Sequence, residues 1–219
     1  ERVRSLVRSV NRRLVRATTV EEIESSVCAV LNDAEPYGFA WIGHVDEARR
    51  TIEPSAWAGI DHEYLDDITI TTDRSNTGKG PAGRAVRKRR IEVSQNVLED
   101  PSFEPWREPI SRKGVGSVAA VPFVHEDRLY GLLVVGAERP DAFDESEQEL
   151  LTDLSEDIAH AINRVTLQRE IERERDRRAT LFENSSDPIV EVRQDAGTLA
   201  VVETNPAYAA TFGADQTAS

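Results

Sequence analysis

The feature that most constrains the fold of this chain is a pair of apolar segments, Ser117–Val124 and Arg128–Ala137, joined by His125–Asp127. Both segments are rich in valine and leucine, and the polar residues between them favour a tight turn. The pattern predicts an antiparallel β-hairpin. A hairpin as apolar as this one has to belong to a sheet that other elements cover.

A long amphipathic helix is predicted after the hairpin. Asp144 is a suitable N-cap residue, and Glu147 stands three positions later, which completes a capping-box pattern. Apolar residues then recur at helical spacing along one face of the segment. This stripe consists of Leu150, Leu151, Leu154, Ile158, Ile162 and Val165.

The residues before the hairpin are predicted to contribute two helices and several strands. Residues 1–17 read as one amphipathic helix, and Thr18 or Thr19 caps a second helix that ends near Asn32. The predicted strands are Phe39–Asp46, Thr51–Ala58, Ile68–Thr72 and Ile91–Val93, with a short helix in Gly78–Arg90 and a polar connection over Asn96–Gly116. We therefore expect an α+β fold for residues 18–165, with a central antiparallel sheet flanked by helices.

The end of the chain has a different composition. Residues 166–182 form a charged helix with almost no apolar stripe, typical of a solvated linker or a weak coiled coil. Two short strands, Ile189–Val192 and Leu199–Val202, are predicted around a turn at Gln194–Gly197, and Asn205 caps a last helix. Residues 183–219 are too few to bury a core of their own, so we expect them to begin a truncated second domain.

The charge balance is strongly acidic, with 40 acidic and 27 basic residues and a formal net charge of −13. Only three of the basic residues are lysines. An acidic, lysine-poor surface suits a halophilic protein, because concentrated salt screens the repulsion between its charges. It also argues against nucleic-acid contact by this part of the protein, which would need a positive face. The arginines of residues 1–17 are interpreted as the solvated face of a helix.

Other simple features narrow the classes of protein further. The sequence has no apolar run of about 18 residues and no signal-peptide pattern, so we expect a cytoplasmic protein without membrane contact. It contains no methionine, even at position 1, which indicates a piece of a longer chain. The single cysteine, Cys28, excludes an internal disulfide and is interpreted as a buried thiol. The four histidines share no metal-ligand spacing, so no metal is predicted, and the cofactor question stays open.

Three spaced motifs carry a family resemblance. They are GPAGRAVRKRRIEVSQNV at residues 80–97, EDPSFEPWRE at residues 99–108 and the segment from SVAAVPFV to DIAHAI at residues 117–162. In this order they resemble a GAF domain over about Thr18 to Val165. The tail, LFENSSDPIVEV followed by ETNPAYAATFG, is similar to the opening of a PAS domain. Together they resemble the multidomain sensor and regulator proteins of haloarchaea, including relatives of the bacterio-opsin activator.

The GAF resemblance implies a six-stranded antiparallel sheet with helices on one face and a small-molecule pocket on the other. Carried onto this chain, it places the pocket walls at Trp57, Tyr64, Phe103, Trp106, Arg107, Ala119 and Val121. The aromatic rings could instead simply cover the core. Arg107 could face an anionic ligand, or pair with Glu104 or Glu108 at the surface.

The resemblance also implies a parallel homodimer formed by the terminal helices. The apolar residues expected to form its interface, and to relay a signal along the helices, are Leu6, Val10, Leu14, Leu151, Leu154, Ile158, Ile162 and Val165.

Several activities of the family are not supported by the sequence. The Asn-Lys-Phe-Asp-Glu set of cyclic-nucleotide binders is missing, and Cys28 lies inside a predicted helix, which is unsuitable for pigment attachment. Reduction of free methionine sulfoxide needs several cysteines in that branch of the family. No nucleophile, base and orienting residue can be assembled either.

The sequence therefore predicts a non-catalytic sensory input module, which binds a small ligand and relays the signal through the linker helix by a population shift. One alternative is a scaffold that only dimerises and binds no small molecule. Another is an enzyme whose catalysis lies in a further domain, or in a degenerate hydrolase site within this chain.

Overall fold

The computed structural model describes residues 2–195 and 198–213 of the chain. It divides into two compact units, Glu1–Thr166 and Leu167–Ser219. The helices are α1 (Arg2–Arg16), α2 (Val20–Asn32), α3 (His62–Asp67), α4 (Pro81–Lys88), α5 (Arg107–Ser111), α6 (Glu145–Asn184) and α7 (Pro206–Phe212), with 3₁₀ turns η1 (Asn76–Gly78) and η2 (Pro101–Trp106). The strands are β1 (Tyr37–Asp46), β2 (Thr51–Ala58), β3 (Glu92–Ser94), β4 (Ser117–His125), β5 (Arg128–Ala137), β6 (Val190–Asp195) and β7 (Thr198–Thr204).

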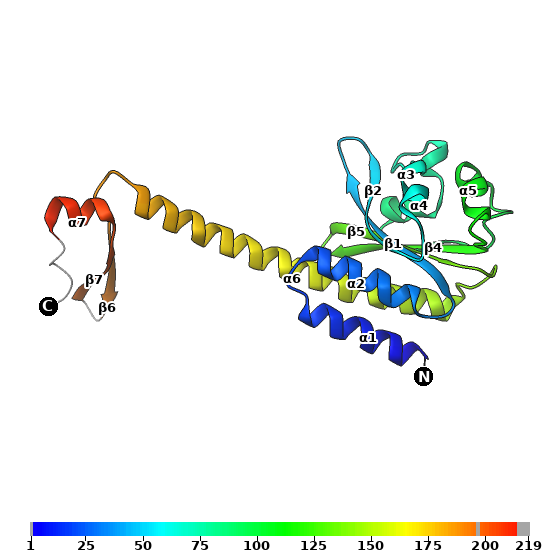
Figure 1. Ribbon diagram of the computed structural model, residues 1–219, viewed down its shortest axis with the longest axis horizontal. Helices are drawn as coiled ribbons and strands as arrows, with labels where there is room; N and C mark the ends of the chain where they lie inside the picture. Colours follow the sequence, from blue (N-terminus) through cyan, green and yellow to red (C-terminus); the bar gives the residue numbers. More distant parts are fainter. Residues whose placement is uncertain (1, 196–197, 214–219) are drawn as a thin grey trace. The chain divides into compact units, whose positions relative to one another are not determined.

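The first unit is built on one antiparallel sheet with the strand order β2-β1-β5-β4-β3. The predicted hairpin is its centre, because β4 pairs with β5 from Ser117 opposite Ala137 to His125 opposite Arg128. Figure 1 shows α1, α2 and α6 on one side of this sheet and α3, α4 and α5 on the other. The expected α+β fold, with an antiparallel sheet flanked by helices, is confirmed.

The sheet has five strands. The resemblance implied a six-stranded sheet, and this expectation was wrong. The segment predicted as a strand at Ile68–Thr72 runs beside β2 but forms only an isolated bridge, between Thr51 and Thr71. The reason is local. Asp73 accepts hydrogen bonds from the Thr71 hydroxyl and the Ser75 N–H, and this polar turn leads the chain away from the sheet edge.

Alternate residues of the strands feed two separate apolar cores. Ala40 and Ile42 of β1 join the cluster under α1, α2 and α6. Phe39 and Trp41 of the same strand join the cluster under α3, α4 and α5. Because the central strands are buried on both faces, their sequences are almost continuously apolar.

The helix side of the first unit is capped as the sequence predicts, with one difference. The Thr19 side chain accepts a hydrogen bond from the Glu22 N–H, and Asp144 accepts one from the Glu147 N–H. The Glu147 carboxylate does not return to the start of its helix. It accepts a hydrogen bond from the Tyr37 hydroxyl at 2.6 Å and pairs with Arg2, which ties α1 and β1 to α6.

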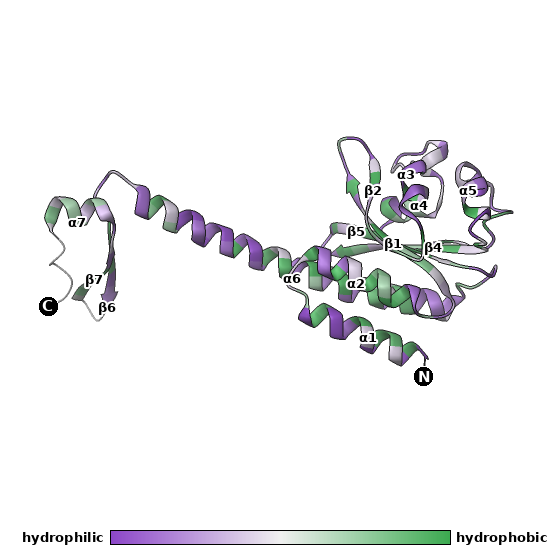
Figure 2. Ribbon diagram, in the orientation of Figure 1, coloured by the Kyte–Doolittle hydropathy of each residue, from purple (hydrophilic) through white to green (hydrophobic). Residues whose placement is uncertain are grey.

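The second unit consists of the last part of α6, the β6–β7 hairpin and α7. Residues of α6 beyond Thr166 are mostly hydrophilic (Figure 2). The Asn205 side chain caps α7 by accepting the Tyr208 N–H, and it also accepts the Ile189 N–H. Of the turn predicted at Gln194–Gly197, residues 196 and 197 lie outside the described residues. No helix in the described part of the chain is both long enough and apolar enough to cross a membrane.

Candidate functional site

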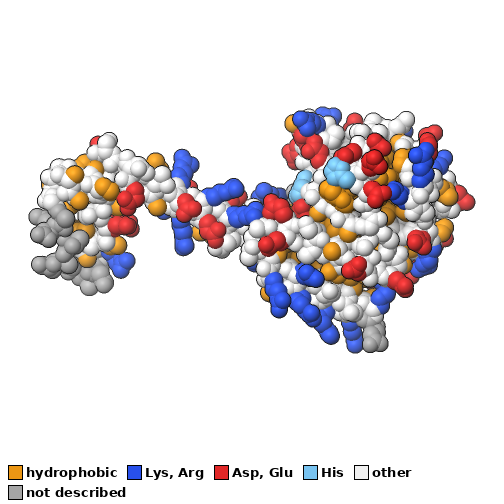
Figure 3. Space-filling view, in the orientation of Figure 1, with side chains coloured by type: hydrophobic (Ala, Val, Ile, Leu, Met, Phe, Trp, Pro, Cys, Tyr) orange, Lys and Arg blue, Asp and Glu red, His pale blue; other side chains and the backbone are white. Residues whose placement is uncertain are grey.

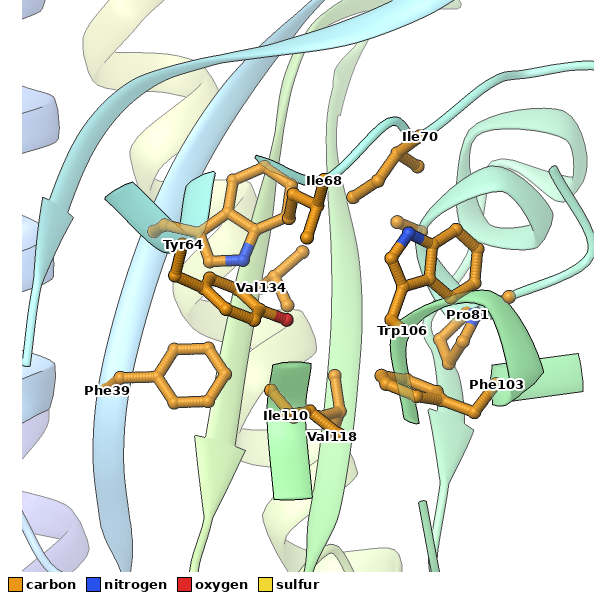
Figure 4. A pocket seen from close by; sticks show the side chains of 13 residues that line it. Phe39, Tyr64, Ile68, Ile70, Pro81, Phe103, Trp106, Ile110, Val118 and Val134 are labelled. Atoms are coloured by element: carbon orange, nitrogen blue, oxygen red, sulfur yellow. The ribbon is translucent and has the colours of Figure 1, made fainter. Parts of the chain in front are cut away.

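An apolar pocket lies between the sheet and the segments that cover its second face (Figure 4). Strand residues form its floor, and α3, the loop after it, α4, η2 and α5 form the walls. The lining residues are Phe39, Trp41, Tyr64, Ile68, Ile70, Gly80, Pro81, Ala82, Phe103, Trp106, Ile110, Val118 and Val134. None of these side chains is charged, so the pocket favours an uncharged or weakly polar group.

Two aromatic residues of η2 form one wall of the pocket. The rings of Phe103 and Trp106 meet edge to face, with centroids 5.6 Å apart. The indole N–H of Trp106 donates to the Thr69 carbonyl oxygen at 3.1 Å, which fixes the ring against the chain after α3. The wall is therefore held by packing and by one directed hydrogen bond.

A glycine at the start of α4 lets this wall close. A Cβ atom at Gly80 would lie 2.4 Å from Cζ3 of Trp106, so a larger residue would push the indole aside. Gly83 has a different reason, because its Cβ would meet the Gly78 and Thr71 carbonyl oxygens at 2.4 and 2.6 Å. The glycines that open α4 thus let the helix approach its neighbours closely.

Tyr64 supplies the polar group of the opposite wall. Its hydroxyl points across the pocket towards the wall that carries Trp106 (Figure 4). Burial raises the pKa of the Tyr64 phenol, so the group stays neutral. Within the described residues this hydroxyl has no hydrogen-bond partner, and a ligand atom placed between the walls could supply one.

The free volume of the pocket is about 30 Å³. That is room for roughly one or two water molecules, whereas pockets that hold a whole organic ligand have roughly 300 Å³ or more. Side chains therefore fill most of the space. A larger ligand would have to displace a wall, and the short segments α3 and η2 are the parts that can move without breaking the sheet.

The predicted pocket residues separate into two groups on the second face of the sheet. Tyr64, Phe103 and Trp106 line the pocket. Trp57 does not, because it is 38% exposed at the end of β2 and packs its ring against His62 with centroids 4.9 Å apart. Arg107 also lies outside the lining, and its Nη2 donates to the Asp100 carbonyl oxygen at 3.1 Å. This hydrogen bond ties Arg107 to the chain before η2.

Ala119 and Val121 do not form the pocket floor, which corrects that prediction. Both side chains are buried in the cluster beneath the helices α1, α2 and α6. The floor of the pocket is formed by Val118 of the same strand and by Val134 of β5. Successive side chains of a strand point to opposite faces, so an error of one residue in the register exchanges the two faces completely.

The pocket contains residues that the sequence analysis missed. Phe39 and Trp41 belong to a strand whose residues are apolar at almost every position, so periodicity did not indicate their face. Ile68 and Ile70 lie in a segment that was read as a strand, although it forms a wall. Pro81 is the first residue of α4, a position that proline favours for local reasons and that gives no signal of a pocket.

The residues expected to form a dimer interface are buried within one copy of the chain. Leu6, Val10 and Leu14 of α1 pack into the same cluster as α2 and the sheet. The predicted stripe on α6 is also buried there. The stripe residues expected at the interface are Leu151, Leu154, Ile158, Ile162 and Val165. These eight side chains are therefore already covered by other residues of the same copy.

The groups that most often carry catalysis lie away from the pocket. Cys28 of α2 is fully buried on the helix side of the sheet, and burial together with the charge of Glu24 raises the pKa of its thiol to about 12. Such a thiol is a poor nucleophile at neutral pH. No group of three or more potential metal ligands occurs among the residues that the structure describes.

A sheet with a helical layer on one face and a small, loop-walled pocket on the other defines an α+β domain with a GAF-like fold. The sequence profile of the GAF domain matches residues 17–163, which is more than half of the chain. The chain therefore belongs to the GAF domain family, a common sensory module of signalling proteins.

Solved structures support the same fold. The GAF domain of a phosphoenolpyruvate-protein phosphotransferase from Coxiella burnetii is 16% identical with a TM-score of 0.64, and the match covers 76% of this chain and 95% of that one. Free methionine-R-sulfoxide reductase from Neisseria meningitidis, in complex with its substrate, is 19% identical with a TM-score of 0.64, covering 76% and 90%. A methyl-accepting chemotaxis protein, residues 122 to 287, is 18% identical with a TM-score of 0.57, covering 73% and 98%. A comparison with curated protein sequences gave no match.

Proposed function

We propose that this GAF domain is a non-catalytic sensory input module of a signalling or transcription-regulatory protein. Its ligand is a small, uncharged and largely apolar molecule held between α3, η2 and the sheet. The observation that carries the proposal is the hydroxyl of Tyr64, which belongs to an otherwise apolar pocket lining and has no hydrogen-bond partner among the described residues. A molecule with one hydrogen-bonding group on an apolar body complements such a site.

The pocket floor offers a route by which binding could reach the helices. Val118 lines the pocket, and its neighbour Ala119 packs against the helical layer. A ligand that moves β4 therefore changes the surface on which α6 packs. For a relay, the ligand must bind the two packings with different affinity, typically by about 1 to 3 kcal/mol. Because α6 is one continuous helix from Glu145 to Asn184, it is the element that would carry the bias.

The second unit fits the same proposal as the opening of a PAS-like domain. The β6–β7 hairpin is followed at once by α7, whose first turn is fixed by Asn205. We also propose a halophilic source for the protein, on the strength of its acidic, lysine-poor composition.

A scaffold that binds no small molecule is the second candidate function. The specific observation in its favour is the pocket volume of about 30 Å³, which shows that side chains alone can close the site. Catalysis has weaker support. The solved relatives include free methionine-R-sulfoxide reductases, but the thiol of this chain is on the other side of the sheet from the pocket.

Native mass spectrometry tests the ligand directly. The protein is purified in concentrated potassium chloride, exchanged rapidly into a volatile salt, and compared with its denatured mass. A reproducible excess mass that is lost in Tyr64→Phe and kept in Tyr130→Phe would support the proposal. Tyr130 is a suitable control, because its hydroxyl donates to Asn163 at 2.8 Å away from the pocket.

Two results would contradict the sensory proposal. The first is a protein with no excess mass whose melting temperature is unchanged by a library of small apolar alcohols and phenols. The second is an excess mass that Tyr64→Phe and Trp106→Ala both retain, which would place the bound molecule elsewhere.

A further inference from the structure

A groove opens on the surface of the first unit beside the turn between β1 and β2. Its free volume is about 330 Å³, compared with about 30 Å³ for the apolar pocket. This volume is within the range of sites that hold a small organic molecule. The lining residues are Val45, Glu47, Arg50, Thr72, Asp73, Val86, Arg87, Arg89 and Leu129. We call this surface the arginine groove.

The lining of the arginine groove has an apolar part and a charged part. Val86 is only 8% exposed, and Val45 and Leu129 pack, partly buried, against the same apolar cluster. The charged residues of the lining are Arg50, Arg87, Arg89, Glu47 and Asp73. Figure 3 shows basic and acidic side chains together at the tip of the hairpin that β1 and β2 form. The groove therefore offers an apolar floor below a polar rim.

The acidic residues of the groove do not pair with its arginines. The Asp73 carboxylate accepts hydrogen bonds from the Thr71 hydroxyl and the Ser75 N–H, so it is engaged within its own turn. In the described part of the chain, the guanidinium groups of Arg50 and Arg89 make neither a hydrogen bond nor an ion pair. Their donors are thus available to a ligand.

Arg87 is held in the groove by the backbone of the loop before α4. Its Nη1 donates to the carbonyl oxygens of Thr72, Asp73 and Gly78. Its Nε and Nη2 have no hydrogen-bond partner among the described residues. Burial, and then the charge of Arg74, lowers the pKa of Arg87. Like charges therefore gather at this place, and an anion would relieve their repulsion.

Two of the three arginines stand on left-handed backbone. The φ angles of Arg50 and Arg89 are 57° and 55°, a region that glycine and asparagine adopt with less strain. Arg50 lies in the turn between β1 and β2, and Arg89 directly follows α4. The chain thus carries arginines where the local conformation does not favour them. Conformational strain of this kind is typical of residues that clamp a ligand.

We propose that the arginine groove binds a small phosphorylated molecule with an apolar body. A phosphate group between Arg50, Arg87 and Arg89 would receive charge-assisted hydrogen bonds from their planar guanidinium forks. Its charge of nearly −2 and its three acceptor oxygens suit several arginines better than a single carboxylate does. The apolar body lies on Val86 and Leu129. The proposal does not depend on a ligand in the apolar pocket, because the two sites share no lining residue.

A small ligand suits this groove better than a polymeric polyanion. The net charge of −13 would repel an extended chain of phosphates, whereas the arginines act on a single phosphate at short range. In concentrated salt the attraction between charges is screened, so the apolar floor has to supply part of the binding free energy. Inorganic phosphate has no apolar body and should therefore bind more weakly than an organic phosphate.

Calorimetric titration with phenyl phosphate tests the site, at one concentration of potassium chloride. The variants are Arg50→Asn, Arg89→Asn and the double variant. Asparagine removes the guanidinium group but suits left-handed backbone, so these proteins should melt at a temperature no lower than that of the unmodified chain. The double variant should bind phenyl phosphate roughly tenfold more weakly or worse, because two charged donors are lost. Inorganic phosphate should bind the unmodified chain more weakly than phenyl phosphate.

Two control variants separate this site from the rest of the molecule. Arg139→Asn, at an exposed arginine on the loop after β5, should keep the affinity for phenyl phosphate. Tyr64→Phe should also keep it, because Tyr64 lines only the apolar pocket. The proposal would be overturned by a protein that does not bind phenyl phosphate, or by a double variant that binds it as tightly as the unmodified chain. Equal affinity for inorganic phosphate, or loss of binding in Tyr64→Phe, would overturn it as well.

Discussion

The imidazole Nε2 of His44 lies 2.7 Å from a carboxylate oxygen of Glu24, and the Glu24 side chain is only 3% exposed. The other ring nitrogen, Nδ1, lies 3.1 Å from the Tyr130 carbonyl oxygen, which can only accept a hydrogen bond. Both nitrogens therefore face acceptors, an arrangement that suits the protonated ring. His44 joins β1 to α2 through this pair, and it also neutralises a carboxylate that would otherwise be buried alone.

Stability should fall with rising pH because of this pair. The hydrogen bond to Glu24 is the main cause that raises the pKa of His44 above its ordinary value of 6.5, with Glu21 adding to it. A raised pKa means that the stabilisation is complete below about pH 6.5 and is lost as the pH rises through the higher, folded-state pKa. The free energy of unfolding of the unmodified protein should therefore fall between about pH 6 and pH 9. In His44→Gln this fall should be smaller by about 1 kcal/mol or less, because the His44 ring is half exposed.

Urea unfolding at several pH values measures this effect, with His62→Gln as the control. His62 lies 2.6 Å from Asp66, but both side chains are more than half exposed. This substitution controls for the loss of an exposed histidine that is paired with a carboxylate. Equal pH dependence in His44→Gln and the unmodified protein would show that the His44–Glu24 pair does not titrate as described.

Gly80→Ala should disturb the pocket wall and destabilise the domain. The new Cβ atom would lie 2.4 Å from the Trp106 indole, so the ring has to move, and overpacking of this kind costs roughly 1–3 kcal/mol. Tryptophan fluorescence should shift, and thermal unfolding should occur at a lower temperature. Gly38→Ala is the control, because its Cβ would meet only Glu138 at an ordinary 3.9 Å. An unchanged spectrum in Gly80→Ala would show that the wall is not tightly closed.

Val118→Ala and Val121→Ala should separate pocket effects from stability effects. Both valines lie on β4 and are at most 3% exposed, and each truncation should cost roughly 1–3 kcal/mol. Only Val118→Ala enlarges the pocket, so only this variant should bind a small aromatic probe such as indole more tightly. Calorimetric titration with the probe measures the difference. Equal binding by the two variants would mean that the probe does not enter the pocket.

Arg87→Lys should loosen the loop that precedes α4. One guanidinium nitrogen of Arg87 donates to the carbonyl oxygens of Thr72, Asp73 and Gly78, so it holds residues of this loop together. A lysine cannot reproduce this geometry, and we expect a loss of roughly 1–3 kcal/mol in the free energy of unfolding. Arg89→Lys, at a neighbouring exposed arginine, should change it by less than about 0.5 kcal/mol. Chemical denaturation compares the two variants, and equal losses would contradict the role given to Arg87.

The sequence predicted those elements whose signals are local. The β4–β5 hairpin and the stripe of α6 follow from residue types and spacing that need no knowledge of distant partners, and the caps at Thr19, Asp144 and Asn205 are equally local. The short elements were harder. α3 and α5 contain six and five residues, too few for a periodic pattern, and they are held by packing over the pocket.

The candidate site was only partly predictable for a related reason. The family resemblance indicated Tyr64, Phe103 and Trp106, whose rings do line the pocket. The floor could not be chosen from the sequence, because β4 is buried on both faces and offers no polar residue to mark one of them. Because β4 does not alternate polar and apolar residues, nothing in its sequence distinguishes Val118 from Ala119 as the residue of the pocket floor.

The burial of α1 has a practical consequence for anyone who works with this domain. The match to the family begins at residue 17, yet Leu6 and Leu14 are each only 4% exposed and Val10 is fully buried. A shorter expression product that starts at the family boundary would expose apolar surface to water, and Arg164 would lose one of its two acceptors, the Leu14 carbonyl oxygen. The folded domain therefore includes α1, which lies outside the residues matched by the family. An expression product should contain α1 if the domain is to be recovered from the soluble fraction.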